Sequence, residues 1–195
     1  MNLNAHPADD ANAPVVGQSW DVEGPVRIAA HQHRRGQLIY TEAGSVSVEA
    51  QGARFVAPPH RAVWLPPGVV HAAFYPRAVA FRGLFFDIDV CREMPSSTAV
   101  LQIDPLCREL IRAAVKFPWG YAPNGPEARL TSVLTDRMSI VRYAPLSLPG
   151  GKSQAVLKIM AALEDNPADN RSTAEWASFV HLTERTLARK FIADS

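Results

Sequence analysis

The sequence has few cysteines, and it lacks long apolar runs. Cys91 and Cys107 are too few and too far apart for a zinc knuckle, so we expect two ordinary reduced thiols. No apolar run approaches the length of a membrane span. The start of the chain, MNLNAHPADDANAP, has neither the basic residues nor the apolar core of a signal peptide. We therefore predict a disordered tail over residues 1–19 and a cytoplasmic protein.

A concentrated positive charge is also missing. The formal net charge is +1, and basic and acidic side chains cancel from residue 150 onward. Because phosphate binding is driven by concentrated positive charge, the bulk charge does not indicate a nucleic-acid partner. Only the local placement of Arg185, Arg189 and Lys190 does. The sequence also has no phosphate-cradling loop and no strong set of nucleophile and base, so no catalytic residue is predicted.

Short apolar runs lie between residues 20 and 90. Val46 and Val48 alternate with polar residues, as in a half-buried strand. Other runs cover residues 55–56, 62–65, 72–75 and 79–86, and turn-forming glycines and prolines separate them. Short strands at close spacing predict a small antiparallel barrel or sandwich over residues 20–90.

Helical periodicity replaces this pattern over residues 91–145. Asp104 and Pro105 fit the start of one helix, and Pro126 fits the start of a second. The second helix has an apolar stripe that either packs on the barrel or mediates dimerisation. The stripe consists of Leu130, Val133, Leu134, Met138 and Val141. Residues 146–152 are predicted to be a linker, after which Ser153 can cap a further helix.

The last part of the chain, residues 153–195, has the pattern of two short helices joined by a turn. Ser172 and Glu175 have capping-box spacing, and Thr183 is a suitable N-cap for the final helix. Leu187 and Phe191 are predicted to face inward. Arg185 and Arg189 lie about 200° around the helix from Leu187. An arginine can pair with guanine or phosphate, so this outer face suits a DNA major groove, although a solvated basic face gives the same pattern.

Residues 172–191 resemble the first helix-turn-helix of the AraC/XylS family of transcription regulators. Thr183, Arg185, Leu187, Arg189 and Phe191 match the family's S-x-R-x-L-x-R-x-F pattern, with threonine in place of serine. The resemblance implies an operator-reading helix over residues 183–194. It makes Thr183, Arg185, Thr186, Arg189 and Lys190 the candidate DNA contacts. His181 departs from the family, which usually has glycine in this turn; the position is strained if it needs positive φ.

The same resemblance predicts the length of the DNA-binding part. Family members carry two such units joined by a long helix, whereas residues 153–195 hold only the first. We therefore expect a truncated DNA-binding domain that binds its operator weakly, because phosphate and groove contacts are missing.

Residues 31–44, HQHRRGQLIYTEAG, and the later PPGVVH resemble the two motifs of the cupin fold. His31, His33 and Gly44 fit the first motif, in which Gln37 takes the glutamate position, and Pro66, Gly68 and His71 fit the second. Three positions depart from the motifs: Pro25, His60 and Tyr75.

Three uses of these histidines are open. His31, His33 and His71, with Gln37, could hold Zn²⁺, Ni²⁺ or Fe²⁺. The neutral Gln37 would lower the affinity relative to a carboxylate. They could instead line a metal-free effector pocket, with Tyr40 and Trp64 as apolar walls, or they could be structural.

Together these patterns predict an α+β protein: a cupin-like antiparallel β-barrel, then helices, then a partial helix-turn-helix domain. The resemblances imply a ligand-responsive, dimeric transcription regulator that is not an enzyme and that binds double-stranded operator DNA and a small-molecule effector. One alternative is a metal-dependent cupin enzyme such as a dioxygenase or isomerase, which the histidines permit. Another is a dimerisation partner that does not bind DNA, which truncation would produce.

Overall fold

The computed structural model describes residues 6–139, 143–144, 147–149, 153–166 and 169–194. The chain divides into a larger unit, residues 1–51 and 55–147, and a smaller one, residues 52–54 and 148–195. Within the described residues, no helix is both long and apolar enough to cross a bilayer.

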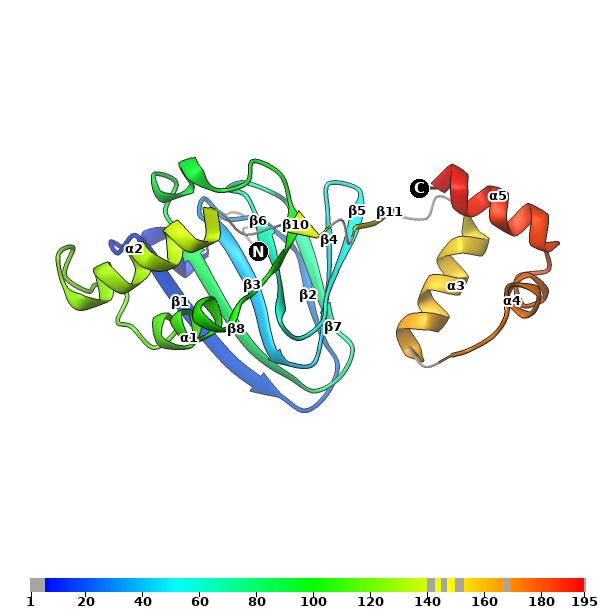
Figure 1. Ribbon diagram of the computed structural model, residues 1–195, viewed down its shortest axis with the longest axis horizontal. Helices are drawn as coiled ribbons and strands as arrows, with labels where there is room; N and C mark the ends of the chain where they lie inside the picture. The colour runs from blue at the N-terminus through cyan, green and yellow to red at the C-terminus, as the bar shows by residue number, and fades with distance from the viewer. Residues whose placement is uncertain (1–5, 140–142, 145–146, 150–152, 167–168, 195) are drawn as a thin grey trace. The chain divides into compact units, whose positions relative to one another are not determined.

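Two antiparallel sheets make up the body of the larger unit, apart from the start of β5 and most of β11, which fall in the smaller one (Figure 1). The strands lie in the order β1-β8-β3-β6-β9-β10 in the first sheet and β11-β5-β4-β7-β2 in the second. The first eight strands follow the jelly-roll order, β1-β8-β3-β6 in one sheet and β5-β4-β7-β2 in the other, an architecture that includes the cupins. The strands are β1 Val15–Val22, β2 Val26–His31, β3 Gly36–Ala43, β4 Val46–Ala50, β5 Ala53–Ala57, β6 Arg61–Leu65, β7 His71–Tyr75, β8 Val79–Phe86, β9 Ala99–Gln102, β10 Tyr143–Ala144 and β11 Ser147–Pro149. The predicted strands are confirmed, as two sheets rather than one closed barrel.

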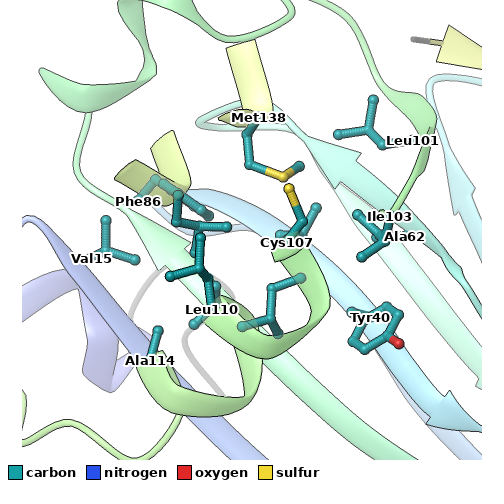
Figure 2. Close-up of a cluster of buried hydrophobic side chains, with 14 of the residues drawn as sticks. Val15, Tyr40, Ala62, Phe86, Leu101, Ile103, Cys107, Leu110, Ala114 and Met138 are labelled. Atoms are coloured by element: carbon teal, nitrogen blue, oxygen red, sulfur yellow. The ribbon is translucent and has the colours of Figure 1, made fainter. Parts of the chain in front are cut away.

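Two helices cover the outer face of the first sheet. α1 (Pro105–Ala114) and α2 (Pro126–Ser139) bury Cys107, Leu110 and Met138 against it (Figure 2). Asp104 caps α1 as predicted, since its carboxylate accepts the N–H of Cys107 at 2.7 Å.

The apolar stripe of α2 is only partly buried. Leu134 and Met138 are buried in the core, whereas Leu130 and Val133 are exposed. Val141 lies outside the described residues.

The predicted disordered tail is wrong for residues 6–19. Residues Pro7–Asp10 form a 3₁₀ helix, η1, and β1 begins at Val15, so the sandwich starts before residue 20. Composition does not reveal this order because tertiary contacts impose it. The buried Arg35 guanidinium donates to the carbonyls of Ala11 and Ala13. The carboxylate of Asp9 accepts the backbone N–H groups of Arg34 and Arg35, which directly precede β3.

Two further boundaries differ from the prediction. A second 3₁₀ helix, η2 (Val90–Glu93), and strand β9 precede α1, so residues 91–145 are not purely helical. Pairing between β9 and β6 makes this short apolar segment a strand. Within the predicted linker, residues 147–149 form β11, and the rest lies outside the described residues.

The smaller unit contains α3 (Gln154–Asp165), α4 (Thr173–Phe179) and α5 (Glu184–Asp194). Ile159, Trp176, Ala177 and Leu187 form its core. Ser153 caps α3, and Ser172 and Glu175 form the predicted capping box at α4. α4 and α5 run in different directions (Figure 1).

Candidate ligand site and DNA-contact surface

Three histidine side chains meet at one end of the sandwich. His31 ends β2, His71 begins β7 opposite it, and His33 follows β2. One ligand nitrogen from each lies within 4.8 Å of the other two. Among the described residues, these three form the group of metal-binding side chains close enough together to share an ion. The predicted convergence of the three imidazoles is therefore present in the structure.

Backbone carbonyls fix the orientation of all three rings. The Nδ1 atoms of His31 and His71 lie 2.9 Å from the carbonyls of Ala29 and Val69, and Nδ1 of His33 contacts the carbonyl of Arg35 at 2.6 Å. A carbonyl only accepts, so each Nδ1 carries a proton. In the neutral rings Nε2 is then the nitrogen that carries the lone pair, and at His33 this atom lies 3.0 Å from Oε1 of Gln37. Metal-binding histidines usually have this arrangement.

The Nε2 atoms of His71 and His33 differ in their surroundings. The buried Nε2 of His71 has no hydrogen-bond partner. Burial lowers the pKa of His71 to about 4, so the ring is neutral near pH 7. The Gln37 amide lies 3.0 Å from Nε2 of His33. An ion bound there would compete with Gln37 for that nitrogen.

Tyr40 and Trp64 do not line this site, contrary to the prediction. Successive side chains of a strand point to opposite faces, and Tyr40 has the opposite parity to Gln37 on β3. Both aromatic rings pack in the cluster that holds α1 against the sheet. Figure 2 shows Tyr40 beside α1. They are core residues on the outer face.

A cavity of about 400 Å³ lies beside His33. Two of its lining residues bind His33 directly: Arg35 through its carbonyl, and Gly68 through its N–H, which donates to the His33 carbonyl at 2.9 Å. The lining consists of Asp9, Arg34, Arg35, Pro67, Gly68, Asp87 and Ile88. Its size suits a small molecule. The predicted pocket residues are not among those that line it.

The sequence reasoning missed His6 and Phe85. The His6 ring stacks on Phe85 at 4.4 Å and lies 5.9 Å from the His33 ring. Burial, and then the neighbouring His33, lower the pKa of His6. The expectation of a disordered tail concealed this histidine, and no motif contains it.

The smaller unit places the predicted DNA contacts on the outside of α5. Leu187 is 2% exposed, whereas Arg185, Arg189 and Thr183 are exposed, and Thr186 and Lys190 are half-buried. The Thr183 hydroxyl accepts the N–H of Thr186 at 3.3 Å, as an N-cap does.

Two details of this unit answer questions raised by the sequence. His181 has φ of 56°, so the turn does use the left-handed region, where the family usually has glycine. Phe191 is 38% exposed, and its predicted inward position is only partly correct. It lines an apolar groove of about 330 Å³ together with Ile159, Leu163 and Trp176.

A jelly roll with a histidine site, joined to a helical unit with an exposed basic helix, has the parts of a ligand-sensing regulator. Comparisons with known proteins agree. The family described as AraC-like ligand binding domain matches residues 12–130. The HTH-type transcriptional regulator NimR of Escherichia coli K12 is 30% identical over 200 residues, covering 100% of this chain and 71% of NimR.

Similar solved structures are more distant. Apo ToxT K231A from Vibrio cholerae strain SCE256 aligns with a TM-score of 0.50 at 7% identity, covering 94% of this chain and 76% of that one. An RmlC-like cupin from Shewanella frigidimarina NCIMB 400 aligns with a TM-score of 0.36 at 23% identity, covering 38% and 68%. The chain belongs to the AraC family of transcription regulators, with a cupin-like ligand-binding domain.

Proposed function

We propose that α5 reads the operator of this regulator through Thr183, Arg185, Thr186, Arg189 and Lys190. The observation that carries the proposal is the division of α5 into a buried Leu187 edge and an exposed Arg185/Arg189 edge. Arginine side chains near the start of such a helix can reach guanine edges or phosphates. The capped start at Thr183 holds this end of the helix in a defined conformation.

Operator binding by single variants tests this assignment. A DNA fragment selected from a random pool by the purified protein serves as the probe. We expect Arg185→Ala and Arg189→Ala each to weaken binding about tenfold or more, the loss typical of one good arginine contact. Lys158→Ala removes the same charge from an exposed position on α3 and is the matched control. Equal affinities for Arg185→Ala, Arg189→Ala and Lys158→Ala would contradict the assignment.

We propose that the histidine site is the sensor. In this proposal His31, His33 and His71 hold a divalent metal, Zn²⁺, Ni²⁺ or Fe²⁺, and Gln37 tunes its affinity. The support is the common orientation of the rings, each with Nδ1–H donated to a carbonyl. Imidazole nitrogen suits all three ions.

Metal content after purification without an affinity tag tests the sensor proposal. His71→Asn keeps a donor for the Val69 carbonyl but removes the ligand nitrogen. We expect this variant to lose the metal, while His60→Asn, which changes an exposed histidine elsewhere, retains it. If the wild-type protein holds none of the three ions even after reconstitution, the metal-sensor proposal is wrong and a metal-free pocket is the remaining interpretation.

The exposed edge of α2 is the candidate surface for self-association. We infer that the chain forms a homodimer through the exposed edge of α2, where Leu130 and Val133 are 41% and 45% exposed. We also infer that the site senses rather than catalyses, because the family it belongs to consists of regulators. A DNA-binding regulator of this kind acts in the cytoplasm. An oxygen-uptake screen of the metal-loaded protein tests the alternative of a dioxygenase.

A further inference from the structure

A fourth imidazole, His6, lies beside the three histidines of the proposed sensor. Its ring centroid is 5.9 Å from that of His33, close to the 6.0 Å between His31 and His33. Those latter two rings supply ligand nitrogens within 4.8 Å of each other. Phe85 stacks on His6 at 4.4 Å and meets the edge of His33 at 5.3 Å. His6 therefore occupies a defined position at the site.

The segment that carries His6 is anchored to the sandwich by buried contacts. The guanidinium of Arg35, a residue 3% exposed, donates to the carbonyls of Ala11 and Ala13. The carboxylate of Asp9 accepts the backbone N–H groups of Arg34 and Arg35 at 2.9 and 3.3 Å. The Ala8 side chain is fully buried. These contacts hold η1, and with it His6, against the end of the sandwich.

His6 has the opposite hydrogen-bonding character to the other three rings. Its Nδ1 accepts the N–H of Ala8 at 3.2 Å, so in the neutral ring the proton is on Nε2. The other three rings donate from Nδ1, so their lone pairs are on Nε2, and that of His33 lies 3.0 Å from Oε1 of Gln37. Three metal-binding nitrogens and one N–H donor thus lie on neighbouring rings. A metal-bound ligand that has an oxygen acceptor matches this combination.

We propose that His6 determines ligand specificity by donating its Nε2–H to an oxygen of a carboxylate or phenolate held at the histidine site. This inference rests on the proposed metal sensor. A bond to an anionic oxygen is worth about tenfold in affinity or more, which is enough to separate ligands with and without that oxygen.

Cobalt(II) and acetate are the probes for this proposal. The untagged, metal-free protein is titrated with Co²⁺ and then with acetate, and both steps are followed by visible absorption of the cobalt ion. His6→Asn retains an oxygen that can accept the Ala8 N–H but loses the ring donor. We expect Co²⁺ affinity within about twofold of wild type and acetate affinity about tenfold weaker. His60→Asn should match wild type in both steps.

The outcomes separate this proposal from the metal site on which it rests. Acetate affinity unchanged in His6→Asn, with Co²⁺ bound normally, would overturn the donor role and leave the metal site standing. A large loss of Co²⁺ affinity in His6→Asn would also overturn it, because His6 would then be a ligand or a structural residue. Absence of Co²⁺ binding by the wild type overturns both proposals. Loss of Co²⁺ binding in His71→Asn together with weakened acetate binding in His6→Asn supports both.

Discussion

At the scale of single residues, the burial of His71 makes the stability of the fold depend on pH. Its folded-state pKa is about 4, against an ordinary value of 6.5, mainly because of burial. Between these values the unfolded chain binds a proton that the folded chain does not. Stability therefore falls as the pH is lowered from 6.5 to 4, and this group contributes at most about 3 kcal/mol to the change. Chemical denaturation of the metal-free protein at several pH values measures the slope.

His71→Asn is the comparison for this measurement, because asparagine does not titrate and can still donate to the Val69 carbonyl. Between pH 6.5 and 4, the free energy of unfolding of the variant should fall less than that of the wild type. Parallel pH profiles for the variant and wild type would show that other groups cause the acid sensitivity.

Residue types and spacing predicted which imidazoles converge, but not their whole environment. His31, His33 and His71 meet as the cupin resemblance implies. The prediction for Tyr40 and Trp64 is wrong, because both lie on the other face of the sheet. The opposite parity of Tyr40 and Gln37 is readable from the sequence, whereas the face of Trp64 depends on its pairing with Leu38 of β3, which the sequence does not show. His6 reaches the site only through the contacts that Arg35 makes with its segment.

At the scale of elements, β1 and α1 approach so closely that glycine is required between them. A Cβ on Gly17 would lie 2.3 Å from the Cα of Val115 and 2.9 Å from the carbonyl oxygen of Ala114. Both atoms belong to the backbone, so they cannot move aside cheaply. We expect Gly17→Ala to reduce the free energy of unfolding by about 3 kcal/mol, as overpacking does. Thermal or urea unfolding measures the change.

Gly24→Ala is the matched control, because a Cβ there meets nothing within 4 Å. Its stability should equal or slightly exceed that of wild type, since alanine restricts the unfolded chain. A Gly17→Ala variant as stable as Gly24→Ala would show that α1 does not lie against β1 as described.

Helix starts were the most predictable elements. Asp104, Ser153 and Ser172 all cap as their spacing indicates, because a cap depends on residues three positions apart. β9 and the segment 6–19 were not predictable, because their order comes from pairing with β6 and from distant side chains such as Arg35.

At the scale of the whole molecule, the exposed edge of α2 predicts self-association. Replacement of Leu130 and Val133 by glutamate should convert a dimer to a monomer in sedimentation equilibrium, because a dimer interface would bury both carboxylates without partners. Leu157→Glu changes a leucine of similar exposure, 44%, in the smaller unit and should leave the dimer intact. A wild-type monomer at micromolar concentration, or a double variant that remains dimeric, would contradict this assignment.

The architecture as a whole was predictable because two independent motifs mark its ends. Cupin-like histidine spacing marks the sandwich, and the pattern around Arg185 and Leu187 marks the final helix. The order of strands within the sheets was not predictable, since pairing such as β1 with β8 joins segments far apart in the sequence.

Directed DNA cleavage from α5 tests the central claim, that this helix reads the operator, most directly. Glu184→Cys places an exposed thiol in the first turn of α5, while burial raises the pKa of Cys91 and Cys107 to about 11, so an iron chelate should attach selectively at residue 184. The account predicts cleavage confined to a few nucleotides within the selected operator, and none from the same chelate at Lys158→Cys. Cleavage that is absent at residue 184, or equal from both positions, would contradict it.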